Sequence, residues 1–172
     1  MIYSNTGNGK TTFLDSVGYK LAARNFQVYR ATSNSSIILK EIPIIRNIPG
    51  DIVLLIDDAF SHIDAIKSII ALGRKDIHIV ASARTSQTEL QEGEITNAFN
   101  NAVELFSLDR LNEKEISACI GFLDKYALWG SRQALPFEQK KRFIEKDCSS
   151  ELLFVILEAL DSPNIGRAFR RF

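Results

Sequence analysis

The strongest constraint on this chain is a run of glycine and polar residues close to its start, Gly7-Asn8-Gly9-Lys10-Thr11-Thr12. Two glycines let the backbone turn its N–H groups inward, and a positive charge and a hydroxyl group follow at once. A helix is expected from about residue 10 to residue 24, and its N-terminal dipole favours an anion at the same place. Such a run is typical of a loop that holds phosphate groups between a buried strand and a helix.

The run departs at one position from the strict pattern of such loops, G-x-x-x-x-G-K-[ST]. The first glycine of the pattern would fall at position 4, where the chain has Ser4. If that position needs a positive φ angle, the loop is strained there or binds phosphate less tightly. The alternative is a plain strand-to-helix turn, in which Lys10 and Thr11 face solvent. The amphipathic pattern of the following helix favours the phosphate loop.

A second segment ends an apolar run in two adjacent carboxylates, D-I-V-L-L-I-D-D-A-F at residues 51–60. The apolar run 52–56 is long enough for a strand buried on both faces. Mg²⁺ on a phosphate needs a carboxylate at the carboxyl end of a neighbouring strand, which suits Asp57 together with the hydroxyl of Thr11. Asp58 is then available to orient or deprotonate an attacking water. Taken alone, the segment also fits a strand that runs into an Asp-rich turn.

A third apolar, β-branched run at residues 77–81 leads into Ser82 and Arg84. Ligands of open α/β sheets lie at the carboxyl ends of the strands, so both side chains are expected to point toward the nucleotide. We predict that Arg84 contacts the γ-phosphate as a sensor. The alternative is a surface arginine in a loop.

Strand and helix patterns alternate through residues 1–110, which predicts an α/β domain with a mostly parallel sheet covered on both faces. The expected strands are 1–3, 26–31, 52–56, 77–82 and 103–107, and the expected helices are 10–24, 35–46, 60–73 and 86–100. The polar segment 85–101 has no clear period, so a mobile loop is the alternative there.

The strand patterns stop after Leu108, and three helical patterns predict a small helical subdomain at residues 111–172. Asn112 and Glu115 are spaced like a capping box at the start of its first helix. A second helix is expected from Pro136 to about Lys146, and a third, capped by Ser149 or Ser150, through Leu160. Residues 130–135 are the expected hinge between these helices.

The composition excludes several classes of protein. Among 172 residues, 21 basic and 21 acidic side chains balance, so no global field attracts nucleic acid or an anionic membrane. The two cysteines, Cys119 and Cys148, lack metal-ligand spacing and suit reduced thiols. No apolar stretch approaches the ~20 residues that span a bilayer. We therefore expect a cytoplasmic protein that does not bind a membrane, and no nucleic-acid partner unless the chain forms a local basic patch.

The order of these motifs resembles the STAND class of signal-transduction ATPases, to which the NB-ARC and NACHT proteins belong. The resemblance rests on the run 7–12, on Leu54-Leu55-Ile56-Asp57-Asp58-Ala59, on Ser82-Ala83-Arg84, and on the spacing from Leu105 to Ile116 ahead of the helices. It implies a three-layer P-loop NTPase sheet of the additional-strand (ASCE) type, with strand order 5-1-4-3-2, followed by a helical lid. It also implies ATP or ADP as ligand, with Mg²⁺.

The expected site residues follow from both lines of reasoning. The nucleotide-binding set is Thr6, Gly7, Asn8, Gly9, Lys10, Thr11 and Thr12; the metal ligands are Thr11 and Asp57; and the catalytic residues are Lys10, Asp58 and Arg84. The Gly-x-Pro motif that many relatives use near the adenine does not occur, and Cys148–Leu152 occupies the corresponding region. Specificity for adenine therefore comes from the resemblance alone.

Relatives of this kind clamp ATP between sheet and lid, self-associate in the closed form and switch on a fused effector. The resemblance thus implies a slow ATPase switch, with self-association through the full-length protein and fused effector or sensor domains absent from this chain. A looser similarity, over residues 111–160, is to bacterial antiphage modules. Because the phosphate loop comes so early, we expect an excised ATPase core; a naturally short first strand is the alternative.

Two other functions stay open. One is an AAA+-like ATPase that acts on nucleic acid as a loader, which would need a basic face. The basic clusters are Arg132, Lys140, Lys141 and Arg142, and Arg167, Arg170 and Arg171, which suit a solvated helix face equally well. The other is a nucleotide-binding scaffold without turnover, suggested by Ser4 and by Asp58 where many active relatives have glutamate.

Overall fold

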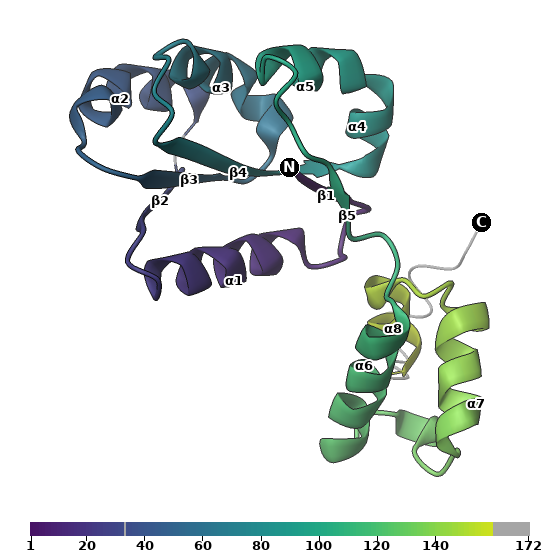
Figure 1. The fold of residues 1–172 in the computed structure, drawn as a ribbon. Coiled ribbons are helices and arrows are strands. Elements are labelled where there is room, and N and C mark those ends of the chain that lie inside the picture. The colour runs from purple at the N-terminus through teal and green to yellow at the C-terminus, as the bar shows by residue number, and fades with distance from the viewer. Residues whose placement is uncertain (33, 160–172) are drawn as a thin grey trace. The chain divides into compact units, whose positions relative to one another are not determined.

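The computed structural model describes residues 1–32 and 34–159 (Figure 1). The chain forms two compact units, Met1–Leu108 and Asp109–Phe172, and each is considered by itself. In the first unit the strands are β1 (Ile2–Ser4), β2 (Gln27–Arg30), β3 (Ile52–Ile56), β4 (Ile77–Arg84) and β5 (Phe106–Ser107). Its helices are α1 (Lys10–Ala22), α2 (Ser35–Asn47), the 3-10 turn Ala59–His62, α3 (Ile63–Ile70), α4 (Thr85–Leu90) and α5 (Glu92–Ala98).

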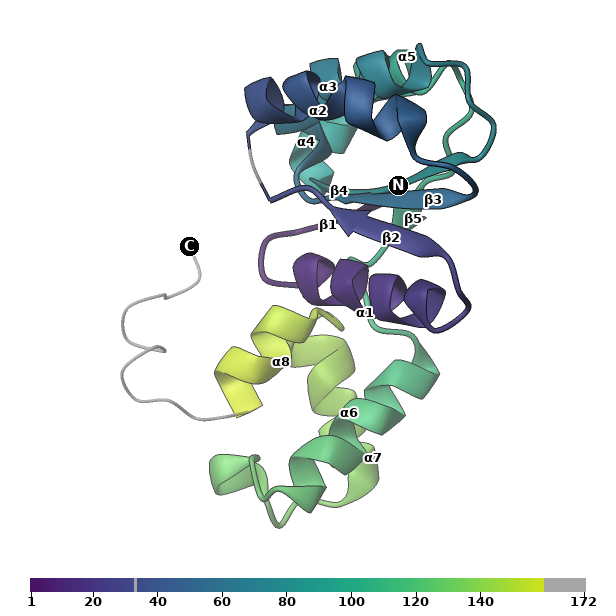
Figure 2. The same cartoon turned by 90° about the vertical axis from the view of Figure 1, so that its left-hand side faces the viewer.

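The strands of the first unit form one parallel sheet in the order β2-β3-β4-β1-β5. Read from the other edge, this is the expected order 5-1-4-3-2, so the predicted fold is confirmed. Helix α1 covers one face of the sheet, and α2, α3 and α5 cover the other (Figures 1 and 2). The unit therefore has three layers.

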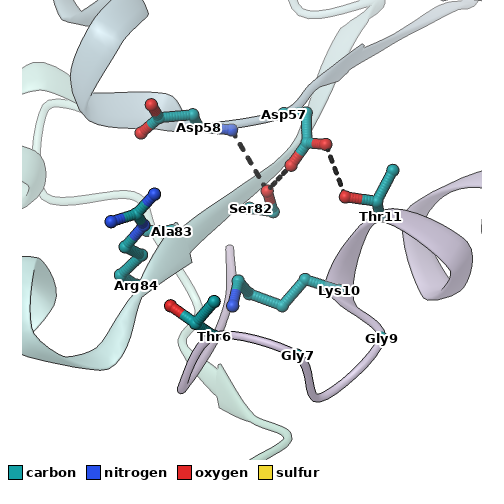
Figure 3. Close-up of a pocket in the computed structure, with 10 residues that line it drawn as sticks. All are labelled: Thr6, Gly7, Gly9, Lys10, Thr11, Asp57, Asp58, Ser82, Ala83 and Arg84. Atoms are coloured by element: carbon teal, nitrogen blue, oxygen red, sulfur yellow. Dashed lines mark hydrogen bonds between the residues drawn. The ribbon is translucent and has the colours of Figure 1, made fainter. Parts of the chain in front are cut away.

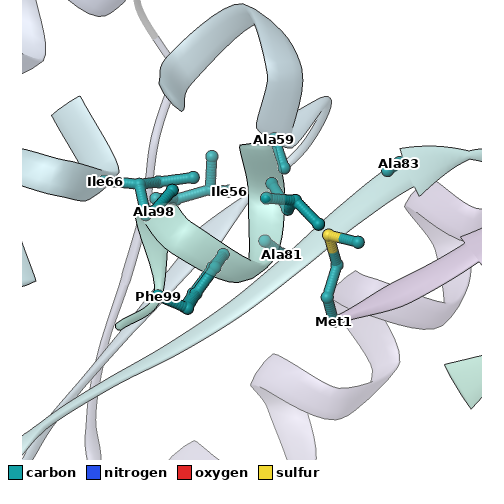
Figure 4. Close-up of a cluster of buried hydrophobic side chains, with 9 residues drawn as sticks. Met1, Ile56, Ala59, Ile66, Ala81, Ala83, Ala98 and Phe99 are labelled. Carbon is teal, nitrogen blue, oxygen red and sulfur yellow. The ribbon is translucent and has the colours of Figure 1, made fainter. Parts of the chain in front are cut away.

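Strand β3 is buried along its whole length, as the apolar run predicts. Its alternate residues point to opposite faces: Val53 and Leu55 pack with Leu14 of α1, whereas Ile56 packs with Ile66 of α3. Figure 4 shows the second of these clusters, in which Met1, Ala59, Ala81, Ala83, Ala98 and Phe99 also take part. Both faces of the sheet thus contribute to the core that fixes the strand ends.

Glycine at position 18 lets α1 approach this sheet closely. A Cβ atom on Gly18 would lie 2.5 Å from Cδ1 of Leu55, which is closer than real Cβ contacts allow. Helix α1 carries the first residues after the phosphate loop, so this close packing sets the position of the loop against β3.

The segment expected as a helix or a mobile loop at 86–100 is two short helices, α4 and α5, which meet at Gln91. Thr88, Ile95 and Ala98 are buried, so the segment belongs to the core of the unit. Two helices of six and seven residues are too short to show a clear period, which is why the sequence looks aperiodic.

The last strand is also shorter than expected, because only Phe106–Ser107 pairs with β1.

The second unit contains α6 (Glu113–Lys125), the 3-10 turn Gly130–Arg132, α7 (Phe137–Arg142), a π-helical turn Phe143–Asp147 and α8 (Leu152–Ala159). The capping box of Asn112 and Glu115 is confirmed at the start of α6. Ser149 and Ser150 have left-handed backbones, with φ of 53° and 59°. Helix α8 begins at Leu152, so Glu151 separates it from the two serines expected to cap it.

The core of the second unit gathers around Trp129, Ile120, Ile144 and Val155, all fully or almost fully buried. Residue 160, the expected end of the third helix, lies outside the described residues. Among the helices of the described part of the chain, none has the length and hydropathy that a membrane-spanning segment needs.

Candidate functional site

A pocket of about 430 Å³ opens where β1, β3 and β4 end (Figure 3). It is lined by Thr6, Gly7, Gly9, Lys10, Thr11, Asp57, Asp58, Ser82, Ala83 and Arg84. The fold thus brings together, around one cavity, residues that the sequence analysis selects from three separate segments. Two of the expected residues lie apart from the lining: Asn8 is buried within the loop, and Thr12 is exposed on α1.

The loop itself depends on two glycines with left-handed backbones. Gly7 has a φ of 88° and Gly9 a φ of 77°, angles that cost little for glycine and more for other residues. The Nζ of Lys10 donates hydrogen bonds of 2.8 Å to the carbonyl oxygens of Ser4 and Asn5. The lysine therefore ties the start of the loop together and carries its charge into the pocket.

Ser4 is the last residue of β1 and is fully buried. Its backbone is extended and pairs in register with Arg84 of β4. The position therefore needs no positive φ angle, and the strain considered for Ser4 does not arise.

Asp57, directly after β3, accepts hydrogen bonds at both carboxylate oxygens. Thr11 Oγ1 donates to Oδ2 over 2.7 Å, and Ser82 Oγ donates to Oδ1. Burial raises the pKa of Asp57, but the hydrogen bonds from Ser82 and Thr11 lower it. With smaller contributions from the Asp58 N–H and the Arg30 charge, the pKa of Asp57 lies below its ordinary value.

Asp58 has a left-handed backbone, with φ 56° and ψ 72°. Its carboxylate points away from Thr11, whereas that of Asp57 points toward it (Figure 3). Ser61 Oγ donates to Oδ2 of Asp58 over 2.6 Å. Within the described residues, Oδ1 of Asp58 is buried and has no hydrogen-bond partner, so it can accept a proton or a hydrogen bond from a ligand.

Two residues have roles at this site that the sequence analysis did not assign. Ser82 donates to Asp57 and accepts a 3.2 Å hydrogen bond from the N–H of Asp58, so one buried hydroxyl positions both acidic residues. Arg30, at the end of β2, places a guanidinium nitrogen 3.9 Å from Asp57 Oδ2. The sequence does contain a signal for each residue: Ser82 is a hydroxyl residue in an apolar strand, and Arg30 is a cation at the carboxyl end of a strand.

The oxygens of Thr11 and Asp57 suit a magnesium ion. Hydroxyl and carboxylate oxygens are hard ligands, and these two already lie within 2.7 Å of each other. Mg²⁺ commonly takes one or two protein ligands and completes its shell with phosphate oxygens and water. The residues present therefore fit the ion that the phosphate loop implies.

A parallel sheet in this order, with a glycine loop after β1 and an acidic pair after β3, defines a P-loop NTPase. Residues 1–96, more than half of the chain, match the family model of Novel STAND NTPase 5. The chain belongs to this family, and the STAND resemblance is confirmed. No match was found among curated proteins.

The fold is also similar to a solved structure, that of AMPPCP-bound DnaA from Aquifex aeolicus. The TM-score is 0.58 and the sequence identity 14%, over 97% of this chain. This chain spans 57% of the length of that one. The likeness supports the P-loop NTPase fold.

We predict that Ser82→Ala raises the pKa of Asp57 and lowers the free energy of unfolding by about 1–3 kcal/mol, because Asp57 Oδ1 and the Asp58 N–H lose their partner. A carboxylate with a lowered folded pKa stabilises the fold above its unfolded pKa and loses this effect as the pH falls through the folded value. The difference between variant and parent should therefore be larger at pH 7 than at about pH 3.

Urea unfolding at both pH values measures this difference, and carboxyl NMR titration measures the pKa. Ser16→Ala, at an exposed position of α1, is the control. If Ser82→Ala unfolds like Ser16→Ala at both pH values, Ser82 does not hold the acidic pair.

Proposed function

We propose that this chain is the ATP-binding and slowly ATP-hydrolysing switch domain of a STAND-type signalling protein, in which the nucleotide state controls assembly of a larger protein. The observation that carries the proposal is the convergence of phosphate loop, acidic pair and Arg84 on one pocket. The family supports a STAND NTPase, and a neighbour solved with AMPPCP supports a nucleotide ligand.

The loop and its lysine account for triphosphate binding in this proposal. The backbone N–H groups around Gly7 and Gly9 would face phosphate oxygens, and Lys10 would offset the charge of the outer phosphates. Thr11 and Asp57 would hold Mg²⁺, which supplies charge neutralisation at the phosphates when it is bound.

Asp58 is proposed as the general base. It lies two residues after the end of β3, and its Oδ1 is a buried acceptor that no described residue occupies. Ser61 holds the other oxygen, so the carboxylate has a fixed direction before a water molecule is presented to it.

Arg84 is proposed as the residue that distinguishes ATP from ADP. It ends β4 beside the last residue of β1, and it lines the same pocket as the loop. An arginine from a neighbouring subunit can contribute ~10³–10⁵ in rate, and a lone domain lacks that contribution. The isolated chain should therefore hydrolyse ATP with a turnover number well below about 1 s⁻¹, which is slower than the range typical of enzymes.

The helical unit is proposed as the lid subdomain of the switch, with self-association through the full-length protein. An antiphage role stays a prediction of the looser resemblance.

The two alternatives lose support at particular residues. A loader acting on nucleic acid needs a basic face, but Lys140 is buried against Asp124 and Lys141 pairs with Glu113 and Glu145. The second basic cluster lies outside the described residues. The scaffold without turnover was suggested partly by strain at Ser4. That strain does not arise, because Ser4 has ordinary strand geometry. These contacts favour the switch.

The first functional prediction concerns Lys10→Ala. Loss of the ammonium group should weaken Mg²⁺-ATP binding by about 2–4 kcal/mol, because a charged partner of the outer phosphates disappears. Calorimetry measures the affinity, and circular dichroism checks the fold, since Lys10 also bridges Ser4 and Asn5. Lys20→Ala, on the exposed side of the same helix, is the matched control. If Lys10→Ala binds ATP as tightly as the parent, the interpretation of this segment as a phosphate loop is wrong.

The acidic pair gives the second prediction. Asp58→Asn should retain ATP binding and slow hydrolysis by about 10²–10⁴-fold, because asparagine tolerates the left-handed backbone but is no base. Asp57→Asn should instead weaken the Mg²⁺-dependent part of binding. Single-turnover phosphate release and calorimetry separate the two. The opposite pattern would mean that the two roles are exchanged.

The third prediction tests the sensor. Arg84→Ala should narrow the ratio of ATP to ADP affinity and leave ADP binding nearly unchanged, because the arginine is expected to contact the γ-phosphate alone. Competition binding with both nucleotides measures the ratio, and Arg46→Ala, exposed on α2, is the control. If Arg84→Ala distinguishes ATP from ADP as well as the parent does, Arg84 is not the γ-phosphate sensor.

A further inference from the structure

Arg30 links the helix after the phosphate loop to the acidic pair. It ends β2, which pairs with β3, the strand that leads to Asp57. One guanidinium nitrogen contacts Oδ1 of Asp15 on α1, and the other lies 3.9 Å from Oδ2 of Asp57. The three side chains are about a third exposed, at 36%, 35% and 34%. One cation is thus shared between two carboxylates of different elements.

The same oxygen of Asp57 faces two partners. Oδ2 accepts the hydroxyl of Thr11 over 2.7 Å and has Arg30 at 3.9 Å. A divalent cation held by Thr11 and Asp57 would therefore be close to a guanidinium of the same sign. Charges only partly exposed are screened less than those at a free surface, so this repulsion acts on the metal.

Asp15 pulls Arg30 the other way. Its contact with the first guanidinium nitrogen is the closer of the two ion pairs, and it draws the positive charge toward α1. Without the Asp15 charge, Asp57 would be the remaining carboxylate that Arg30 contacts among the described residues. Asp15 therefore opposes the interaction between Arg30 and Asp57.

We propose that Arg30 competes with the metal ion for Asp57, and that Asp15 sets the strength of this competition. The pair would then tune the Mg²⁺ concentration that nucleotide binding requires. This inference rests on the proposed function, since it takes Thr11 and Asp57 as the residues that hold the magnesium ion of the nucleotide.

If Arg30 competes with the metal ion, neutral replacements of Arg30 and of Asp15 should shift the Mg²⁺ concentration needed for ADP binding in opposite directions. Arg30→Gln should lower the Mg²⁺ concentration for half-maximal ADP binding by about two- to fivefold, the range expected for a partly exposed charge pair. Asp15→Asn should raise it by a similar factor, because Arg30 is released toward Asp57. The double variant should behave like Arg30→Gln alone, since Asp15 acts through Arg30.

The experiment is calorimetric titration of the whole chain with ADP, in EDTA and over a series of Mg²⁺ concentrations. Arg24→Gln, at an exposed arginine just after α1, is the control and should match the parent. Thermal unfolding of each variant checks that it is folded. Raising the NaCl concentration should reduce the differences in Mg²⁺ requirement among the variants, because salt screens the charges.

The parent chain is measured first, which separates the two levels of inference. A parent that binds no ADP, or binds it equally in EDTA and in Mg²⁺, overturns both the proposed metal site and the competition. A parent with a clear Mg²⁺ requirement that Arg30→Gln leaves unchanged or raises overturns the competition alone. The same holds if Asp15→Asn shifts the requirement in the same direction as Arg30→Gln, since that marks an ordinary structural ion pair.

Discussion

Strand β4 lies between β3 and β1, and its backbone pairing with both fixes the level of the side chains around the pocket. Ile56 pairs with Ala81 and Ser4 pairs with Arg84, so the residues that follow β3 and β1 emerge at the same edge of the sheet. A shift of one residue in this register would turn Ser82 to the opposite face of the sheet. Both acidic residues would then lose the hydroxyl group that positions them.

Two carboxylates that are adjacent in sequence have different surroundings at this edge. Asp57 accepts hydrogen bonds at both oxygens, which favours its charged form. Asp58 turns away on a left-handed backbone and keeps one buried oxygen without a partner among the described residues. Neighbouring groups with separate surroundings can take separate roles, one as a metal ligand and one as a base.

Much of this arrangement could be predicted from the sequence. The apolar runs locate the central strands, and the loop, the acidic pair and Arg84 follow from their positions after those runs. The strand order came from the family resemblance. The role of Ser82 needed the strand register, and the contact of Arg30 with Asp15 needed the packing of α1 beside β2, neither of which a local pattern contains. The left-handed backbones of Ser149 and Ser150 belong to a turn just before α8 that no local sequence pattern predicts.

The hydrogen bonds from Lys10 to the carbonyls of Ser4 and Asn5 have a consequence for the thermodynamics of binding. They are made by the chain itself, so the loop takes its shape from its own lysine and two glycines. A ligand that meets a loop already shaped in this way spends little of its interaction free energy on ordering the backbone. The entropic cost of complex formation then falls mainly on the ligand and on the lysine, which exchanges one set of oxygen acceptors for another.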